Sequence, residues 1–162
     1  MKSKEKLILS YLRRNARETL TSLSKLTGFP VSTLHDKVKK YKSNTICRYT
    51  VLFNEKILGY EIKVHVLIKS LSPRREELID YLKCHPNVNR LARINNGFNL
   101  FMELIFASIQ EVEDFLEEMS GRFHISEKKV YWLVDEILRE NFFSDPEIAK
   151  ACILQQEMRE AM

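Results

Sequence analysis

Cysteines and long apolar runs are scarce in this chain of 162 residues, and each scarcity excludes a class of protein. The three cysteines, Cys47, Cys84 and Cys152, are too few and too scattered for a disulfide framework or a CxxC metal site, so we expect reduced thiols. No apolar run approaches the roughly 18 residues that a membrane-spanning helix needs. The amino terminus has no small-residue cleavage site behind an apolar core. We therefore expect a soluble, cytoplasmic protein without membrane attachment.

Acidic residues are scarce in the first third of the chain. Residues 1–56 carry 13 Lys and Arg against 4 Asp and Glu, a net charge of +9, whereas the remainder carries 13 against 18, a net charge of −5. This asymmetry indicates that residues 1–56 meet a polyanion. The alternative is a solvated basic face that has no partner.

Apolar residues recur at helical spacing in three successive segments of residues 1–44. Thr19 or Thr21 can cap the second helix, Gly28 supplies the left-handed conformation that ends it, and Pro30 starts the third. Two short helices around a Gly-Phe-Pro turn, the second one basic, are typical of a helix-turn-helix that enters the DNA major groove. The residues expected to face inward are Leu7, Ile8, Tyr11, Leu12, Leu20, Leu23, Leu26, Leu34, Val38 and Tyr41.

The outer side of the third helix supplies the candidates for DNA contact. Its first turns carry Ser32, Thr33 and His35 where base edges are read, and its lysines have the reach for phosphates. His35 has no second His or Cys at ligand spacing, so we expect no metal, and its alternative is an ordinary exposed histidine. Asp36 repels phosphate unless it pairs with a lysine or accepts a hydrogen bond from cytosine N4. The DNA-binding candidates are Thr21, Ser22, Ser32, Thr33, His35, Asp36, Lys37, Lys39, Lys40 and Arg48.

A strand pair is predicted behind the third helix. Residues 46–53 alternate in a β-rich segment that ends before Gly59, which is typical of a wing or a linker. Lys42 and Arg48 either touch the DNA backbone there or are solvated surface charges.

The second half of the chain predicts the order β, α, β, β, α, β. Residues 62–68 alternate strictly, a helix follows from Pro73, and residues 88–94 and 98–106 flank a tight turn. A helix from residue 109 and a strand over residues 128–138 complete a ferredoxin-like antiparallel sheet with both helices on one face. The other face also carries apolar residues and needs a cover, which a second copy would provide. Leu67, Phe101 and Ile105 are such residues, and Tyr131, Trp132 and Leu133 put apolar side chains on both faces of the last strand.

The predicted fold is therefore α+β. Residues 1–56 form a winged helix-turn-helix DNA-binding domain, residues 57–140 a ferredoxin-like dimerisation and regulatory domain, and residues 141–162 a C-terminal helical tail. The tail carries Ile148 and Cys152 on its apolar side, and we expect it to dock on its own domain or on a partner subunit.

Four segments resemble the Lrp/AsnC (leucine-responsive, feast/famine) family of transcription regulators. RRNARETLTSLSKLTGF resembles the exit of the family's first helix and its second helix, and STLHDKVKKY resembles its recognition helix. ICRYTVLFNEKILGY is similar to the wing and linker, and NNGFNLFMEL to the Gly-x-Tyr-Asp-Leu turn and strand of the regulatory (RAM-type) domain. Together the segments span about residues 4–138.

The resemblance implies a sequence-specific DNA-binding regulator that forms a homodimer, a tetramer or an octamer, and that in many members responds to an amino acid or another small effector. The chain departs from the family at three places. Asp36 and Lys37 stand where two basic residues are usual, Asn99 replaces an acidic residue, and Pro30 replaces a serine cap.

The resemblance places an effector site at Asn95, Asn96, Gly97, Phe98 and Asn99. The alternative, which the residues themselves favour, is a plain hairpin, since Gly97 permits positive φ and asparagine tolerates it.

Two other functions share this two-domain layout. A siroheme-decarboxylase-like enzyme would need converging histidines, whereas His65, His85 and His124 are scattered in the sequence, so we expect neither catalysis nor a cofactor. An adaptor that has lost DNA binding is the second alternative, and Asp36 makes it conceivable. We expect a transcription regulator that binds double-stranded DNA.

Overall fold

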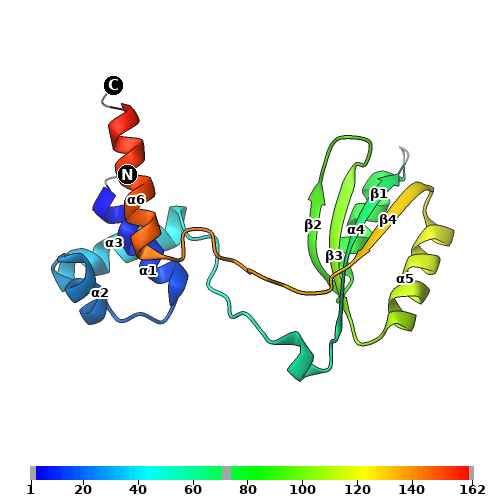
Figure 1. Cartoon of the computed structure of the whole chain (residues 1–162), viewed down its shortest axis with the longest axis horizontal. Coiled ribbons are helices and arrows are strands. Elements are labelled where there is room, and N and C mark those ends of the chain that lie inside the picture. Colours follow the sequence, from blue (N-terminus) through cyan, green and yellow to red (C-terminus); the bar gives the residue numbers. More distant parts are fainter. Residues whose placement is uncertain (1–2, 71–73, 161–162) are drawn as a thin grey trace. The chain divides into compact units, whose positions relative to one another are not determined.

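The computed structural model describes residues 3–70 and 74–160, which form two compact units (Figure 1). The first unit contains the described residues up to Leu52 together with those from Ile137 onward, and the second contains Phe53–Glu136. The described part of the predicted C-terminal tail, residues 141–160, lies in the first unit. The reason is that its helix packs directly on the first helix of the chain.

The first unit is built from three short helices and the C-terminal helix. These are α1 (Ser3–Arg14), α2 (Leu20–Thr27), α3 (Val31–Asn44) and α6 (Pro146–Glu160). Thr19 caps α2 by accepting a hydrogen bond from the backbone amide of Ser22 at 3.1 Å, and Gly28 ends it at φ 73°. Pro30 precedes α3 without a side-chain cap. The predicted cap at Thr19 and the predicted left-handed glycine at Gly28 are confirmed at the two ends of α2.

The core of this unit follows the predicted periodicity with one exception. Leu26 was expected to face inward, but 45% of its surface is exposed. Leu23 is the residue of the eight-residue α2 that is fully buried. The buried side chains shared by α1, α2 and α3 are Ile8, Leu12, Leu23, Leu34 and Tyr41.

Helix α6 runs beside α1 (Figure 1). It buries Ala149 and Ile153, whereas Ile148 and Cys152, the predicted apolar side, are exposed. The prediction failed because apolar residues lie on several sides of α6, so their spacing does not single out one face. Arg13 of α1 forms an ion pair with the side chain of Glu140, in the segment that precedes α6. It also donates a hydrogen bond to the backbone carbonyl of Glu140 at 3.2 Å.

The strand pair expected over residues 46–53 does not form. Residues 47–52 make no backbone hydrogen bond to any other described residue, and a short 3₁₀ helix, Glu55–Leu58, follows them. Alternation indicates an extended backbone, but a strand also needs a neighbour to pair with. One copy of the chain supplies none within its described residues.

The second unit is a four-stranded antiparallel sheet with the order β2-β3-β1-β4. Its elements are β1 (Ile62–Ser70), α4 (Arg75–Cys84), β2 (Val88–Arg93), β3 (Leu100–Phe106), α5 (Ile109–Arg122) and β4 (Ile125–Trp132). The predicted order and the first three strands are confirmed. The fourth begins earlier and ends at Trp132, and Pro73, where the first helix of this unit was expected to start, lies outside the described residues.

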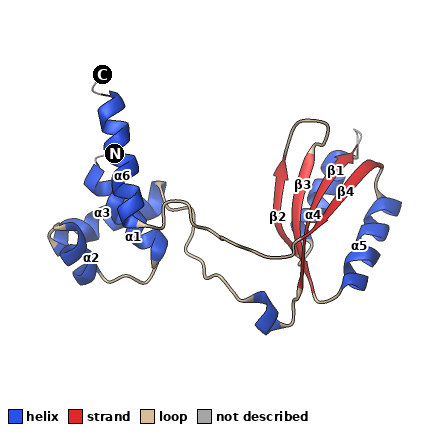
Figure 2. Ribbon diagram, viewed as in Figure 1, coloured by secondary structure: helices blue, strands red, loops and turns tan. Residues whose placement is uncertain are grey.

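Both helices of the second unit cover the same face of the sheet (Figure 2). The alternating residues Val64, Val66 and Ile68 of β1 face them and are fully buried. Met102 and Leu104 pair with Val66 and Val64 in the neighbouring strand and extend the same layer. No described helix of the second unit covers the opposite face of the sheet.

The docking of α6 on α1 predicts a contrast between two adjacent residues. Ile153 is 4% exposed and Leu154 is 59% exposed. We expect Ile153→Ala to lower the free energy of unfolding by roughly 2–5 kcal/mol, and Leu154→Ala to change it by less than about 0.5 kcal/mol. Urea denaturation of the full chain followed by circular dichroism measures both. Equal effects of the two substitutions would contradict the docked position of α6.

Candidate nucleic-acid interface

Helix α3 turns one face to the core and the other to solvent. Leu34 and Tyr41 are buried against α1 and α2, and this fixes the rotation of α3 about its axis. The opposite side exposes Ser32, His35, Asp36, Lys39 and Lys40, as predicted, while Thr33 is half-buried. The exposed side of α3 therefore brings together short polar side chains near its start and two lysines about two turns later.

Lys37 lies on a different side of α3 from the other two candidate lysines. Its side chain is only 24% exposed and forms an ion pair with Glu5 of α1, whose side chain is 21% exposed. Its ammonium also lies 5.4 Å from the centre of the Phe29 ring. These contacts place Lys37 between α1 and α3, where it supports the fold. Glu5 is 32 positions away, so local spacing could not reveal this pair.

The remaining DNA-binding candidates lie around α3. Thr21 is exposed on α2, and the backbone amide of half-buried Ser22 serves the Thr19 cap. Arg48 is exposed in the extended segment after α3. The Nδ1 atom of His35 lies 3.4 Å from a carboxylate oxygen of Asp36, so these two neighbours can pair when the histidine is protonated.

The three histidines of the second unit do not converge. His65 hydrogen-bonds to Glu103 at 3.0 Å, and His124 is exposed. His85 packs on Phe115 with ring centres 4.5 Å apart, and burial lowers the pKa of its imidazole although Glu118 acts in the opposite direction. Residues 3–70 and 74–160 contain no cluster of three His, Cys, Asp or Glu side chains that could hold a metal ion.

Known proteins resemble this chain in sequence and in fold. No model of a protein family matches the sequence. An uncharacterized HTH-type transcriptional regulator of Pyrococcus furiosus, PF1231, is 30% identical over 120 residues, which cover 73% of this chain and 80% of that protein. The chain belongs to the Lrp/AsnC family of DNA-binding transcription regulators.

Solved structures of the Lrp/AsnC family show the same fold. Bacillus subtilis LrpC superposes with a TM-score of 0.78 over 85% of this chain and 97% of LrpC, at 19% identity. E. coli AsnC gives a TM-score of 0.76 over 86% of this chain and 95% of AsnC, at 20% identity.

Among the described helices, none has the length and apolar character needed to cross a membrane.

The turn at Asn95–Asn99, where the resemblance predicts an effector site, is a tight hairpin in this Lrp/AsnC protein. Asn96 and Gly97 adopt positive φ values of 72° and 93°, and the amide of Ile94 donates to the carbonyl of Asn99 at 3.2 Å. Lys129 of β4 lies over the Phe98 ring at 5.1 Å. The turn geometry explains why asparagine and glycine stand at positions 96 and 97, and the contact with Lys129 gives Phe98 a structural role.

Asn99 ties the hairpin to the end of β1. Its side-chain oxygen accepts a hydrogen bond from the amide of Ser70 at 3.1 Å, and its side-chain nitrogen donates to the carbonyl of Ser70 at 2.8 Å. A carboxylate at this position could accept the first bond but could not donate the second. The departure from the acidic residue of the family therefore has a structural use in this chain.

The uncovered face of the sheet carries apolar and charged side chains around a hydrogen-bonded polar centre. Leu67 pairs with Phe101 across β1 and β3, and Tyr131 lies opposite His65 across β1 and β4. Glu103 is held between His65 and Asn89. Burial acts to raise the pKa of the Glu103 carboxyl, but the hydrogen bonds from Asn89 and His65 outweigh it, so its pKa lies below its ordinary value. Glu103 is therefore ionised at neutral pH.

The two bonds of Asn99 predict how its substitution affects stability. We expect Asn99→Asp to lower the free energy of unfolding of the second unit by about 1–3 kcal/mol, because the carboxylate would face the Ser70 carbonyl without a proton to donate. Asn95→Ala, at an exposed position of the same turn, serves as the control and should change the stability little. Thermal denaturation at neutral pH measures both. An Asn99→Asp protein as stable as the parent would show that the bridge to Ser70 contributes nothing.

Proposed function

We propose that the chain binds double-stranded DNA in a sequence-specific manner as a homodimer, with α3 as the recognition helix. The observation that carries the proposal is the exposed side of α3. Lys39 and Lys40 are exposed on it, and neither forms an ion pair within the described part of the chain. Cations without carboxylate partners on an exposed helix are suited to phosphates, since each contact releases counterions from the DNA.

The outward-facing residues of α3, with half-buried Thr33 among them, are proposed to divide into two roles. Ser32, Thr33 and His35 lie in its first turns and are proposed to contact base edges, whereas Lys39 and Lys40 contact phosphates together with Arg48. Thr21 and Ser22 lie at the start of α2 and are proposed as further backbone contacts. Asp36 is proposed to accept a hydrogen bond from cytosine N4, which would offset its repulsion of phosphate. Because its ammonium is paired with Glu5, Lys37 is proposed to hold α3 against α1 and not to contact phosphate.

Two features of the structure support a homodimer. The uncovered face of the sheet carries Leu67, Phe101 and Tyr131 beside a polar centre, as in an interface between two copies. Residues 47–52 have unpaired backbone groups beside the exposed side chains of Tyr49 and Val51. A second copy could pair with this extended segment and cover the sheet face, and a two-fold dimer of helix-turn-helix units suits a pseudo-palindromic DNA site.

An effector at the Asn95–Asn99 turn remains a prediction from the resemblance. A non-enzymatic role is likewise part of this proposal, and its support is that the histidines of the second unit serve separate packing and hydrogen-bonding contacts.

DNA recognition can be tested by selecting bound fragments from a random double-stranded pool at two salt concentrations. We expect enrichment of an inverted repeat with half-sites about 10 base pairs apart. In titrations with the selected site, Lys40→Ala should weaken binding to all sequences about equally and lower the salt slope by about 1, whereas Thr33→Ala should change site preference.

Two control substitutions sharpen this test. Lys83→Ala removes an exposed charge from α4 of the second unit and should leave DNA binding unchanged. Lys37→Met keeps an apolar stem but loses the Glu5 pair, so it should lower thermal stability while keeping the salt slope near that of the parent. If Lys40→Ala and Thr33→Ala both leave the titrations unchanged, α3 is not the recognition helix.

The dimer is tested by placing a charge on the uncovered face of the sheet. We expect the parent chain to sediment with twice the mass of one copy, and Leu67→Arg to shift it towards the monomer, because an unpaired charge would be buried at the interface. Glu117→Arg on exposed α5 is the matched control and should sediment like the parent. A Leu67→Arg protein that keeps the parent mass would exclude this face as the interface.

A further inference from the structure

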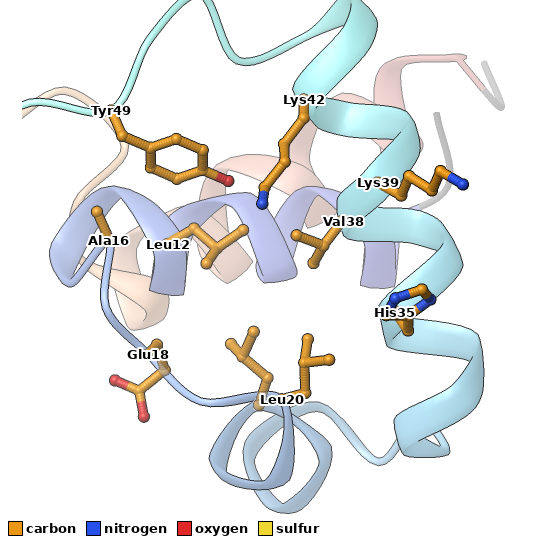
Figure 3. Close-up of a pocket in the computed structure, with 10 residues that line it drawn as sticks. Leu12, Ala16, Glu18, Leu20, His35, Val38, Lys39, Lys42 and Tyr49 are labelled. Atoms are coloured by element: carbon orange, nitrogen blue, oxygen red, sulfur yellow. The ribbon is translucent and has the colours of Figure 1, made fainter.

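The helix-turn-helix unit contains a cavity of about 430 Å³ beside the exposed side of α3, and His35 and Lys39 of that side stand on its rim (Figure 3). It opens between α1, the start of α2 and one flank of α3, entirely within the first unit. Small-molecule sites in proteins typically measure about 300–1,000 Å³, so this cavity has the size of a small ligand site.

The floor of the cavity is apolar. Leu12 of α1, Leu20 of α2 and Val38 of α3 approach it from three directions (Figure 3), with Leu23 beside them. Leu20 and Val38 are half-buried, so their remaining exposed surface faces this space or the solvent. An apolar group placed there would be removed from water, which is favourable in proportion to the area buried.

One edge of the cavity carries a cation and a hydroxyl. The Lys42 side chain extends from α3 across the cavity above Leu12, and Tyr49 lies on the other side of it with its hydroxyl turned inward (Figure 3). The Lys42 ammonium is 5.6 Å from the centre of the Tyr49 ring and forms no ion pair with a described residue. Burial raises the pKa of Tyr49, so its hydroxyl keeps its proton and can donate.

The other charged side chains of the rim are directed elsewhere. Lys39 points its ammonium away from the cavity (Figure 3) and remains available to DNA. Glu18 lies at the edge opposite Lys42 and accepts a hydrogen bond from the side-chain amide of Asn15 at 3.0 Å. The cavity therefore combines an apolar floor with one donor edge.

We propose that this cavity binds a small organic monocarboxylate with an aromatic or branched apolar tail. The carboxylate lies at Lys42 and the Tyr49 hydroxyl, and the tail covers Leu12, Leu20 and Val38. A charge-assisted hydrogen bond fixes the head group, and apolar burial holds the tail. An inorganic anion could use the first interaction only, so it should bind much more weakly.

Occupancy of the cavity is coupled to DNA binding, and this part of the proposal rests on the proposed function. Lys42 lies on α3 three positions after Lys39, where it can also reach a phosphate. A carboxylate that neutralises Lys42 removes one cation from the DNA interface. By linkage, the ligand then weakens DNA binding and DNA weakens ligand binding by the same factor.

The site itself is tested without DNA, by methyl NMR of the full chain titrated with 3-phenylpropionate, with its neutral amide 3-phenylpropanamide and with inorganic phosphate. We expect saturable shifts of the Leu12, Leu20 and Val38 methyl groups with 3-phenylpropionate, and about tenfold weaker binding of the amide. Absence of saturable shifts at millimolar concentrations overturns the proposal, as does binding of phosphate as tight as that of 3-phenylpropionate.

Substitutions separate the two halves of the site. Lys42→Met should weaken 3-phenylpropionate about tenfold and leave the amide unchanged, whereas Lys25→Met, an exposed charge change on α2, should affect neither. Leu20→Phe, which fills the floor, should weaken both compounds, and thermal denaturation shows whether this variant is folded. If Lys42→Met binds 3-phenylpropionate as the parent does, the assignment of the head group is wrong.

Coupling is measured by fluorescence anisotropy with the selected DNA site. We expect 3-phenylpropionate to weaken DNA binding severalfold in the parent chain and to have no effect in Lys42→Met. Methyl shifts without an effect on DNA binding would overturn the regulatory half of the proposal and leave the site intact. A chain that binds no DNA would overturn the proposed function, while the NMR titration would still decide whether the cavity binds the carboxylate.

Discussion

The packing of α1 is the constraint on which the rest of the first unit depends. One side of this helix supplies Ile8 and Leu12 to the core shared with α2 and α3, and α6 covers another side. Ion pairs extend from both ends of the same helix, from Glu5 to Lys37 of α3 and from Arg13 to Glu140 before α6. The rotation and position of α3, and hence which of its residues face outward, follow from these contacts. A change in the core of α1 would therefore alter the exposed side of α3, which is the proposed DNA-binding surface.

The second unit meets a different constraint, because its helices cover only one face of a two-faced sheet. The centre of the other face is not simply apolar, since His65, Asn89 and Glu103 form a hydrogen-bonded group between Leu67, Phe101 and Tyr131. Polar groups that are hydrogen-bonded within one chain can be covered by a second copy without leaving a donor or an acceptor unpaired. Such a group also restricts how two sheets can be placed on each other, because a shifted register would bring apolar side chains onto Glu103.

Local patterns in the sequence predicted much of the fold and less of the site. The alternation of Val64, Val66 and Ile68, the cap at Thr19 and the turn at Gly28 are determined by near neighbours, and they were confirmed. The inward direction of Lys37, the docking of Ala149 and Ile153, and the bridge from Asn99 to Ser70 were missed. Each joins residues far apart in the sequence, so no local spacing encodes it. The prediction of a strand pair over residues 46–53 was wrong for another reason, since an extended segment becomes a strand only when a neighbouring strand pairs with it.

The structure also changes how the charge of the first unit should be counted. The net +9 of residues 1–56 already counts Glu5, which pairs with Lys37, and Asp36, which lies on the exposed side of α3. Arg13 is in addition paired with Glu140, which lies outside that range. The cations left near α3 are few, chiefly Lys39, Lys40, Lys42 and Arg48. Because the electrostatic part of DNA affinity grows with the number of phosphates neutralised, a single unit with so few cations would bind weakly at physiological salt. Two units on one DNA double the number of contacts and the sequence that is read, so the sparse charge around α3 is itself an argument that recognition requires two copies of the chain.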